Sequence, residues 1–387
     1  MEVRSGRTPQ PALGIYIHIP FCLSKCGYCD FVSRPILPGA LEPYLEALAR
    51  EVAAAPETGR RVGTVYVGGG TPSLLAPLQL GRLLDAVRAA FAVAPDAEVT
   101  LEVNPGTLSA AGARGYRDCG VNRVSLGVQS LDDALLARIG RRHTAGEALA
   151  AYELLRAAGF DNVGFDLIRG LPGQSPAIWR RDLARATALA PEHLSLYGLG
   201  IEEGTALHRE QVAGRLALPG EDEEAAMLAA TEELTAAGGY ERYEISNYAR
   251  PGFRCRHNLD CWAFAEYRGF GVAAHSFLRQ PAPVRLANIA DLDGYVRLAG
   301  SGQSAVVRRE ETAPRRLAGE ALMLALRTAD GIDEAAFAAA HGARWETLFA
   351  EAAALGASRG WIGRAGGRAR LTGEGLLFSD AVFRLLF

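Results

Sequence analysis

Three cysteines near the amino terminus have the residue type and spacing best suited to chemistry in this sequence. Cys22, Cys26 and Cys29 lie within eight residues, although the whole chain of 387 residues holds only six cysteines. Three thiolates leave one iron of a four-iron cluster without a protein ligand, whereas a closed structural zinc site takes four ligands. The spacing therefore predicts a [4Fe-4S] cluster with one open iron, at which a small molecule can react.

The same spacing is compatible with two other structures. Positions 22, 26 and 29 would share one face of a helix, where they would form a buried stripe. Pro20 and Gly27 in and beside the segment disfavour such a helix. A zinc site is the second alternative, and it would need His18 or Asp30 as a further ligand.

The elements that must position these cysteines alternate between strands and helices. Short apolar runs are each followed by a turn and by a stretch with helical periodicity, which is typical of a parallel sheet covered on its faces. Six such units predict an α/β fold with a partial (β/α)6 barrel. We expect strands at 14–19, 64–67, 99–103, 123–128, 163–168 and 193–199, and helices at 41–55, 77–91, 109–118, 132–139, 146–158 and 177–188.

Polar or glycine-rich segments stand at five consecutive strand ends. The first strand is followed by PFCLSKCGYCD, and the later ones by GGGTPS, NPGT, QS and RGLPG. In barrels of this kind the functional residues gather at the carboxyl ends of the strands. The segments therefore predict one site, built around the cysteines.

The regular alternation ends near residue 200, and we expect three parts. Residues 1–200 form the barrel with the cluster site, and 201–290 form an extension that holds a charged helix near 221–237 and the motifs YEISNYA and HNLDCW. Residues 291–387 form a mostly helical, winged-helix-like domain. Its expected helices are 314–327, 332–340 and 345–359, followed by a short strand.

Composition narrows the classes of partner. The formal net charge is −3 with acidic and basic residues interspersed, which disfavours a nucleic-acid partner. The first residues hold no apolar targeting segment, and no run approaches the ~18 apolar residues of a membrane span. We expect a soluble cytoplasmic protein.

CLSKCGYC resembles the CxxxCxxC signature of radical S-adenosylmethionine (SAM) enzymes, and further motifs resemble the HemN/HemW family within that superfamily. The resemblance covers about residues 14–275 and implies a partial radical SAM barrel followed by a small HemN-type helical domain. The motifs that carry it are YIHIPFC, VYVGGGTPS, LEVNPGT, GVNRVSLGVQS, FDLIRGLPGQ, HLSLYGLGIEEGT, YEISNYARPG and HNLDCW.

The resemblance also implies a set of cofactor-binding residues. Glycines after the second strand let a backbone approach the ligand closely, and an arginine pairs with a carboxylate in bidentate geometry. Two acidic residues at strand ends suit ribose hydroxyls or a cationic ligand. Cys22, Cys26 and Cys29 would hold the cluster, and Tyr16, Tyr28, Gly69, Gly70, Thr71, Glu102, Gln129, Arg141 and Asp166 would contact SAM or the cluster.

Two departures from the family patterns separate its branches. Oxygen-independent coproporphyrinogen III dehydrogenases of the HemN type have a further cysteine two residues after the third ligand, where this chain has Phe31. HNLDCW resembles the HNxxYW motif of HemW-like proteins, with Cys261 in place of the tyrosine. Imidazole and thiolate are both axial ligands of heme iron. His257 is therefore the candidate heme contact, and Cys261 adds a thiol beside it.

These departures favour a heme chaperone of the HemW type. It would bind heme and a [4Fe-4S] cluster with SAM, and transfer heme to an acceptor protein such as a membrane respiratory enzyme. Expected partners also include an electron donor such as flavodoxin or ferredoxin, and a second copy of the chain in a homodimer. The alternatives are a radical oxidative decarboxylase of coproporphyrinogen III and another radical SAM enzyme such as a methylase.

Overall fold

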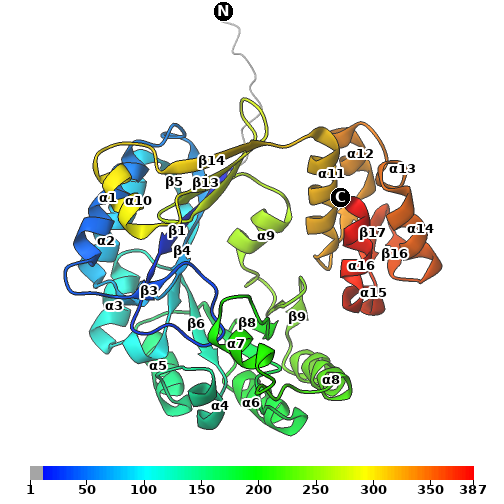
Figure 1. Ribbon diagram of the computed structural model, residues 1–387, viewed down its shortest axis with the longest axis horizontal. Coiled ribbons are helices and arrows are strands. Elements are labelled where there is room, and N and C mark those ends of the chain that lie inside the picture. The colour runs from blue at the N-terminus through cyan, green and yellow to red at the C-terminus, as the bar shows by residue number, and fades with distance from the viewer. Residues whose placement is uncertain (1–11) are drawn as a thin grey trace, which may run out of the picture.

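The computed structural model describes residues 12–387 of the chain. A twelve-stranded sheet forms the body of the molecule, with helices along its outer face and a separate helical domain at the carboxyl terminus (Figure 1). The expectation about the first residues of the chain lies outside the described part. Within that part, no helix is both long enough and apolar enough to span a membrane.

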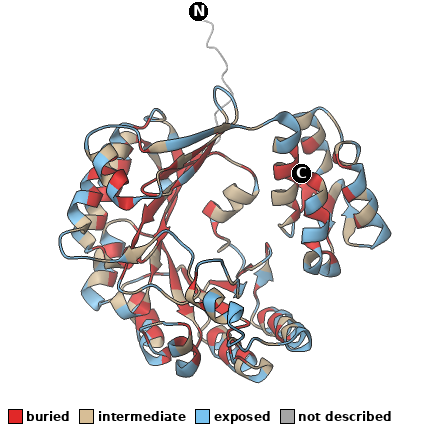
Figure 2. Cartoon of the chain, in the orientation of Figure 1, coloured by how far each residue is buried: buried red, intermediate tan, exposed pale blue. Residues whose placement is uncertain are grey.

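Six parallel strands form the centre of the sheet and confirm the predicted βα units. They pair in the order β1, β4, β5, β6, β7, β8, and their side chains are buried while the helices expose their outer faces (Figure 2). The strands are β1 (Leu13–Ile19), β4 (Arg61–Gly69), β5 (Ala92–Val103), β6 (Arg123–Gln129), β7 (Val163–Arg169) and β8 (His193–Gly198). The helices are α1 (Leu41–Ala53), α2 (Pro77–Ala90), α3 (Ala110–Asp118), α4 (Asp133–Arg138), α5 (Ala145–Ala157) and α6 (Pro176–Ala188).

The starts of these helices follow from local chemistry. The Thr144 side chain accepts a hydrogen bond from the Glu147 backbone N–H, and the Glu147 carboxylate accepts one from the Thr144 N–H, so α5 begins at a capping box. Asp132 and Ser175 cap α4 and α6 in the simpler way, with one side-chain oxygen on the first-turn amides. Each cap fixes where a strand-end loop stops.

Further strands extend both edges of the parallel sheet, and most of them are antiparallel. β11 (Tyr267–Phe270) pairs in parallel with β1 and is followed by β12 (His275–Leu278), β13 (Val284–Asn288) and β14 (Val306–Glu311). On the far edge β8 pairs with β10 (Asn247–Ala249), and β10 pairs with β9 (Glu241–Arg242). The charged helix expected at 221–237 is α8 (Glu221–Ala237).

The expected domain boundary at residue 291 does not coincide with the end of the sheet. α10 (Leu292–Gly300) packs against α1, and β14 is still paired with β13. The separate core begins with α11 (Pro314–Leu326) and includes Leu322, Phe349 and Val382. Because apolar side chains of α10 join the barrel core, residues 291–311 belong with the barrel.

The C-terminal domain is helical with a small antiparallel sheet. The helix expected over 345–359 is divided at Phe349, whose backbone leaves the helical region at φ −131° and ψ 57°. The remaining elements are α12 (Glu334–His341), α13 (Trp345–Leu348), α14 (Ala350–Ser358), α15 (Gly373–Leu377), α16 (Ser379–Phe383), β15 (Ile332–Asp333), β16 (Ile362–Ala365) and β17 (Arg368–Leu371).

Glu51 on α1 ties the barrel to its antiparallel extension. Its carboxylate accepts hydrogen bonds from the Gly271 N–H at 2.8 Å, the Asn288 side-chain amide at 2.6 Å and the Tyr295 hydroxyl at 2.7 Å. We expect Glu51→Ala to lower the free energy of unfolding by about 2–4 kcal/mol, because three donors lose their acceptor. Urea unfolding followed by circular dichroism measures the change.

Glu42→Ala is the matched control on the same helix. Glu42 is exposed and pairs with Arg82 at 3.1 Å, so its loss should cost no more than about 1 kcal/mol. Equal effects of the two substitutions would contradict the role of Glu51.

Candidate functional site

A cavity of about 600 Å³ opens at the carboxyl ends of the parallel strands. The structure brings most of the predicted site residues together around it, from segments far apart in the sequence. Cys22, Cys26, Tyr28, Cys29, Gly69, Gly70, Thr71, Glu102, Gln129, Arg141 and Asp166 line the cavity, and Tyr16 and His257 are not among the lining residues.

Backbone hydrogen bonds fix the conformation of the cysteine segment at its ends and in its middle. The strand pair β2 (Phe21–Cys22) and β3 (Arg34–Pro35) closes its ends, with the Ile36 N–H donating to the Cys22 carbonyl at 2.9 Å. In the middle, the Gly27 N–H donates to the Ile139 carbonyl at 2.9 Å. The segment is a loop rather than a helix, so the alternative of a helical stripe is wrong.

The glycine loop after β4 packs directly on this segment. The Gly70 N–H donates to the Ile19 carbonyl at 2.7 Å, and the Thr71 N–H donates to the Phe21 carbonyl at 2.8 Å. A Cβ at Gly70 would lie 2.7 Å from the Phe21 oxygen and 3.0 Å from Cys22 Sγ. Glycine is therefore required here for close approach to the cysteine segment, whereas the predicted approach to a ligand stays a prediction.

Arg141 faces the cysteines rather than solvent. Its Nη1 donates to Cys26 Sγ at 3.7 Å and its Nη2 donates to the Gly127 carbonyl at 2.6 Å. The Nε is buried and has no hydrogen-bond partner within residues 12–387. The guanidinium therefore places positive charge beside Cys26 and keeps a donor available for an anionic ligand.

Two carboxyl groups, those of Glu102 and Asp166, line the same cavity as the cysteines. Glu102 accepts hydrogen bonds from the Tyr66 hydroxyl at 2.9 Å and the Gly69 N–H at 3.0 Å, and Asp166 accepts one from Ser125 Oγ at 3.0 Å. Burial and the nearby Asp166 charge raise the pKa of Glu102 to about 7, and burial raises the pKa of Asp166. Such a pair can accept hydrogen bonds from hydroxyl groups while carrying less than two full negative charges.

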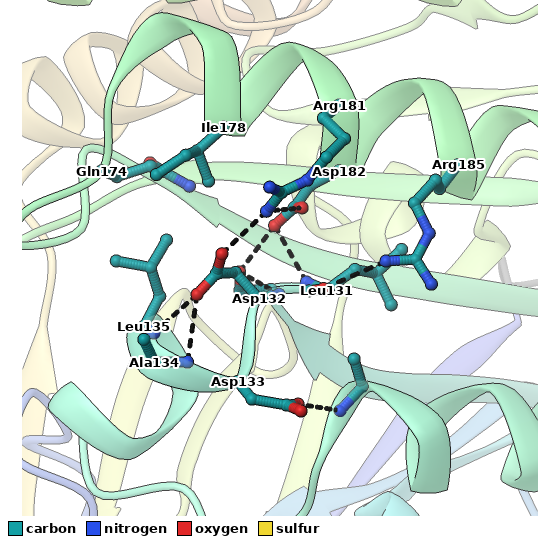
Figure 3. Close-up of polar contacts among 12 residues, drawn as sticks. Leu131, Asp132, Asp133, Ala134, Leu135, Gln174, Ile178, Arg181, Asp182 and Arg185 are labelled. Atoms are coloured by element: carbon teal, nitrogen blue, oxygen red, sulfur yellow. Dashed lines mark hydrogen bonds and ion pairs between the residues drawn. The ribbon is translucent and has the colours of Figure 1, made fainter.

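A buried aspartate supports the loop that carries Gln129. Gln129 is a non-glycine residue with φ 67°, and the next residue turns away from the cavity. Asp182 on α6 accepts hydrogen bonds from Ser130 Oγ at 2.6 Å and the Leu131 N–H at 2.9 Å (Figure 3). The two residues of the QS segment therefore have different roles: Gln129 lines the cavity, and Ser130 fixes the loop through its hydrogen bond to Asp182.

Tyr16 and His257 both pack against Tyr66, which itself lines the cavity. The Tyr16 hydroxyl forms a hydrogen bond with His18 Nδ1 at 2.9 Å. His257 lies on α9 (Arg256–Trp262), with Nδ1 2.9 Å from Thr64 Oγ1 and its N–H donating to Glu98 at 3.0 Å. Their contacts with SAM and heme stay predictions. Thr64 engages Nδ1 of His257, which leaves Nε2 as the ring nitrogen for a heme contact.

His143 is a cavity residue that the sequence reasoning missed. It is 3% exposed, and its Nε2 lies 3.1 Å from the Val128 carbonyl, so that nitrogen must carry the proton. Nδ1 is left as an acceptor without a partner in the described chain. Burial, with the charge of Arg141, lowers the pKa of His143 to about 4. Its position two residues after Arg141 was the available signal.

The donor set fits a cluster better than the zinc alternative. Both ring nitrogens of His18 are engaged, with Tyr16 and with the Val32 carbonyl at 2.8 Å, and Asp30 is exposed. Across residues 12–387, no three His, Cys, Asp or Glu side chains are grouped as the ligands of a single metal ion would be. A cubane binds each thiolate through a different iron atom, so it does not need such convergence.

Comparison with known proteins agrees with this geometry. A model of the radical SAM superfamily matches residues 16–185, and a model of the HemN C-terminal domain matches residues 313–378. The fold is also that of a solved structure, coproporphyrinogen III oxidase (HemN) from Escherichia coli, at TM-score 0.84 and 23% identity over 98% of this chain and 91% of that one. Fold and site together define a radical SAM protein with a HemN-type C-terminal domain.

Relatives with a named function show which branch of the radical SAM proteins this chain resembles. The heme chaperone HemW of Mycobacterium tuberculosis is 38% identical over 98% of this chain and 97% of its own length, and that of Bacillus subtilis is 34% identical over 95% and 97%. The heme chaperone HemW of Escherichia coli is 42% identical over 70% and 71%. The chain belongs to the HemN/HemW family, in its HemW branch.

We expect Gly70→Ala to weaken cluster binding, because the added Cβ pushes against Phe21 and Cys22. Overpacking of this kind costs about 1–3 kcal/mol. Iron and acid-labile sulfide per chain, measured after anaerobic reconstitution, should fall. In Gly106→Ala, on the same cavity wall, the new Cβ meets His143 Cβ at an ordinary 3.6 Å, and its iron content should match the unsubstituted protein. Full loading of Gly70→Ala would refute the close-packing argument.

We expect the apoprotein to lose stability as the pH falls from about 6.5 toward 4. Burial lowers the pKa of His257 to about 4, below its ordinary value, so the folded state favours the neutral ring and unfolding takes up protons in this window. His257→Gln should lose about 2 kcal/mol less than the unsubstituted protein between pH 7 and 5. Urea midpoints at the two pH values measure this, and His208→Gln on α7 (Ala206–Val212) is the control. Parallel pH profiles of the His257 variant and the unsubstituted protein would contradict the prediction.

Proposed function

We propose that this protein is a heme chaperone that carries a [4Fe-4S] cluster with SAM, binds heme and transfers it to an acceptor protein. Relatives named as heme chaperones HemW at 34–42% identity support the proposal. The observation that carries it is Phe31. It lines the cluster cavity, 58% exposed, at the position where HemN-type dehydrogenases have a further cysteine.

Cys22, Cys26 and Cys29 would hold the cluster. Reduced clusters of this kind supply one electron to the sulfonium of bound SAM. The backbone of Gly69 and Gly70 would take the ammonium group of SAM, and Arg141 would take its carboxylate.

The buried carboxyl groups complete the proposed SAM site. Glu102 and Asp166 would accept hydrogen bonds from the ribose hydroxyls, since their raised pKa values limit repulsion between them. Gln129 and Thr71 line the same wall and would contact the rest of the ligand.

The proposed partners follow from the same site. Cys26 and Cys29 are only partly buried, so an electron donor such as flavodoxin or ferredoxin would reach the cluster from the mouth of the cavity. The acceptor of heme would be a protein such as a membrane respiratory enzyme, approached from the cytoplasm. Assembly into a homodimer is a further part of the proposal.

Anaerobic reconstitution followed by a heme titration, in parallel with a coproporphyrinogen assay, tests this function. We expect saturable heme uptake and no protoporphyrinogen IX. Cys26→Ala should lose iron and sulfide because two thiolates hold the cubane poorly, whereas Cys119→Ala should keep both. Cys119 lies away from the cavity, with its Sγ donating to the Pro77 carbonyl at 3.1 Å.

The outcomes separate the functions. Absence of heme uptake by well-loaded protein would remove the chaperone function. Conversion of coproporphyrinogen III to protoporphyrinogen IX would replace it with the dehydrogenase, and a methylated product would point to a methylase.

A further inference from the structure

A second cavity continues the first one toward the C-terminal domain. It measures about 360 Å³, and Tyr197 and Asn258 line both cavities. Its far wall consists of Trp262 on α9 and of Leu324 and Arg327 at the end of α11. Figure 1 shows α9 between the sheet and α11, so this seam cavity lies where the barrel and the C-terminal domain meet.

Direct contacts fix the two sides of the seam. The Ala329 N–H donates to the Tyr243 carbonyl at 3.0 Å, and Glu244 and Thr328 form a β-bridge. Arg254 lies 3.7 Å from Asp330 across the same boundary. Arg327 is therefore held against the barrel by its immediate neighbours in the chain.

Arg327 is a cation without a counter-charge in the described chain. Its guanidinium carbon lies 5.7 Å from the centre of the Trp262 ring and 5.3 Å from that of Phe383. Its Nε is buried and has no hydrogen-bond partner within residues 12–387. By contrast, Arg285 and Arg316, which line the neighbouring cavity, both pair with Glu320.

The other polar groups of the seam cavity leave Arg327 as the group that can bind an anion. Asn247 is 4% exposed, and its Oδ1, a hydrogen-bond acceptor, has no partner in the described residues. Glu244 is the acidic residue that lines this cavity, and its carboxylate accepts a hydrogen bond from the Ser246 N–H at 3.1 Å. Because Glu244 is buried, its charged form is disfavoured, and it competes weakly for Arg327.

Several large apolar side chains line the rest of the cavity. Tyr197 is 42% exposed and Ile245 is 37% exposed, although both are large hydrophobic side chains, and Trp262 and Leu324 line the same cavity. Aromatic rings pack well against a planar conjugated ligand, and a guanidinium binds a carboxylate through two parallel hydrogen bonds. This combination fits the edge of a tetrapyrrole that carries a propionate.

We propose that the seam cavity binds one propionate edge of heme, with Arg327 on the carboxylate and Tyr197 and Trp262 against the ring. The remainder of the macrocycle extends past Asn258 toward the larger cavity. This inference rests on the proposed heme-binding function and specifies where heme lies. It also explains why Asn258 and Trp262 of the HNLDCW motif line cavities while His257 is held behind them.

A titration with two forms of one porphyrin tests the proposal. Iron mesoporphyrin and its dimethyl ester share the ring and the iron, but the ester lacks carboxylate charges. The full-length protein should bind the diacid about tenfold more tightly than the diester, measured from the Soret band. Arg327→Gln should lose that preference, and Arg327→Lys should restore part of it, since lysine keeps the charge without the planar fork.

Arg316→Gln is the matched control on α11. Its guanidinium pairs with Glu310 and Glu320, so its loss should leave the preference for the diacid unchanged. SAM also carries a carboxylate, so a control titration with SAM tests whether Arg327 binds that group instead. Weaker SAM binding by Arg327→Gln, with heme binding unchanged, would assign Arg327 to SAM and overturn the proposal.

The results distinguish this inference from the function on which it rests. If the full-length protein bound neither porphyrin, the chaperone function itself would fail. If it bound the diacid and the diester equally, or if Arg327→Gln kept the full preference, heme binding would stand and its placement at Arg327 would be wrong. The preference of the unsubstituted protein for the diacid over the diester is measured without any variant. Poor folding of one variant therefore leaves this test intact.

Discussion

The arrangement of the site depends on a short loop whose main chain is satisfied by its surroundings rather than by itself. The cysteine segment is not helical, so its amides and carbonyls find partners on β3, on the turn after α4 and at the start of α7. Buried main-chain groups without such partners would be costly. These bonds leave the sulfur atoms directed into the cavity, and the glycine loop after β4 can then come within contact distance of Cys22.

The cavity contains both a positively charged group and carboxyl groups whose pKa values are raised. Near the cysteines, the guanidinium of Arg141 supplies positive charge beside sulfur. Elsewhere in the cavity, loss of solvent raises the pKa values of Glu102 and Asp166, and the charge of Asp166 raises that of Glu102 further. Both carboxyl groups can act as hydrogen-bond acceptors. The neutral ring of His143 adds an acceptor between these regions. A ligand with a cationic centre, a carboxylate and hydroxyl groups finds a complementary group for each.

The central fold could be predicted from the sequence because each βα unit is signalled locally. The polar or glycine-rich segments at strand ends predicted one site, and Gly70, Glu102, Gln129 and Asp166 do line one cavity. The antiparallel strands β9 and β10 could not be predicted, since they are only two and three residues long and β10 joins the sheet through the distant β8. The expected boundary at 291 and the division between the two cores differ, because the apolar side chains of α10 belong to the barrel core.

The separation of the molecule into two hydrophobic cores has a mechanical consequence. β14 ends at Glu311 and α11 starts at Pro314, so a two-residue connection joins the barrel to the C-terminal domain. A rotation about that connection would break the Ala329–Tyr243 hydrogen bond and the Glu244–Thr328 bridge, but it would leave both cores packed. Opening and closing at the seam would therefore leave the barrel and the C-terminal domain each folded.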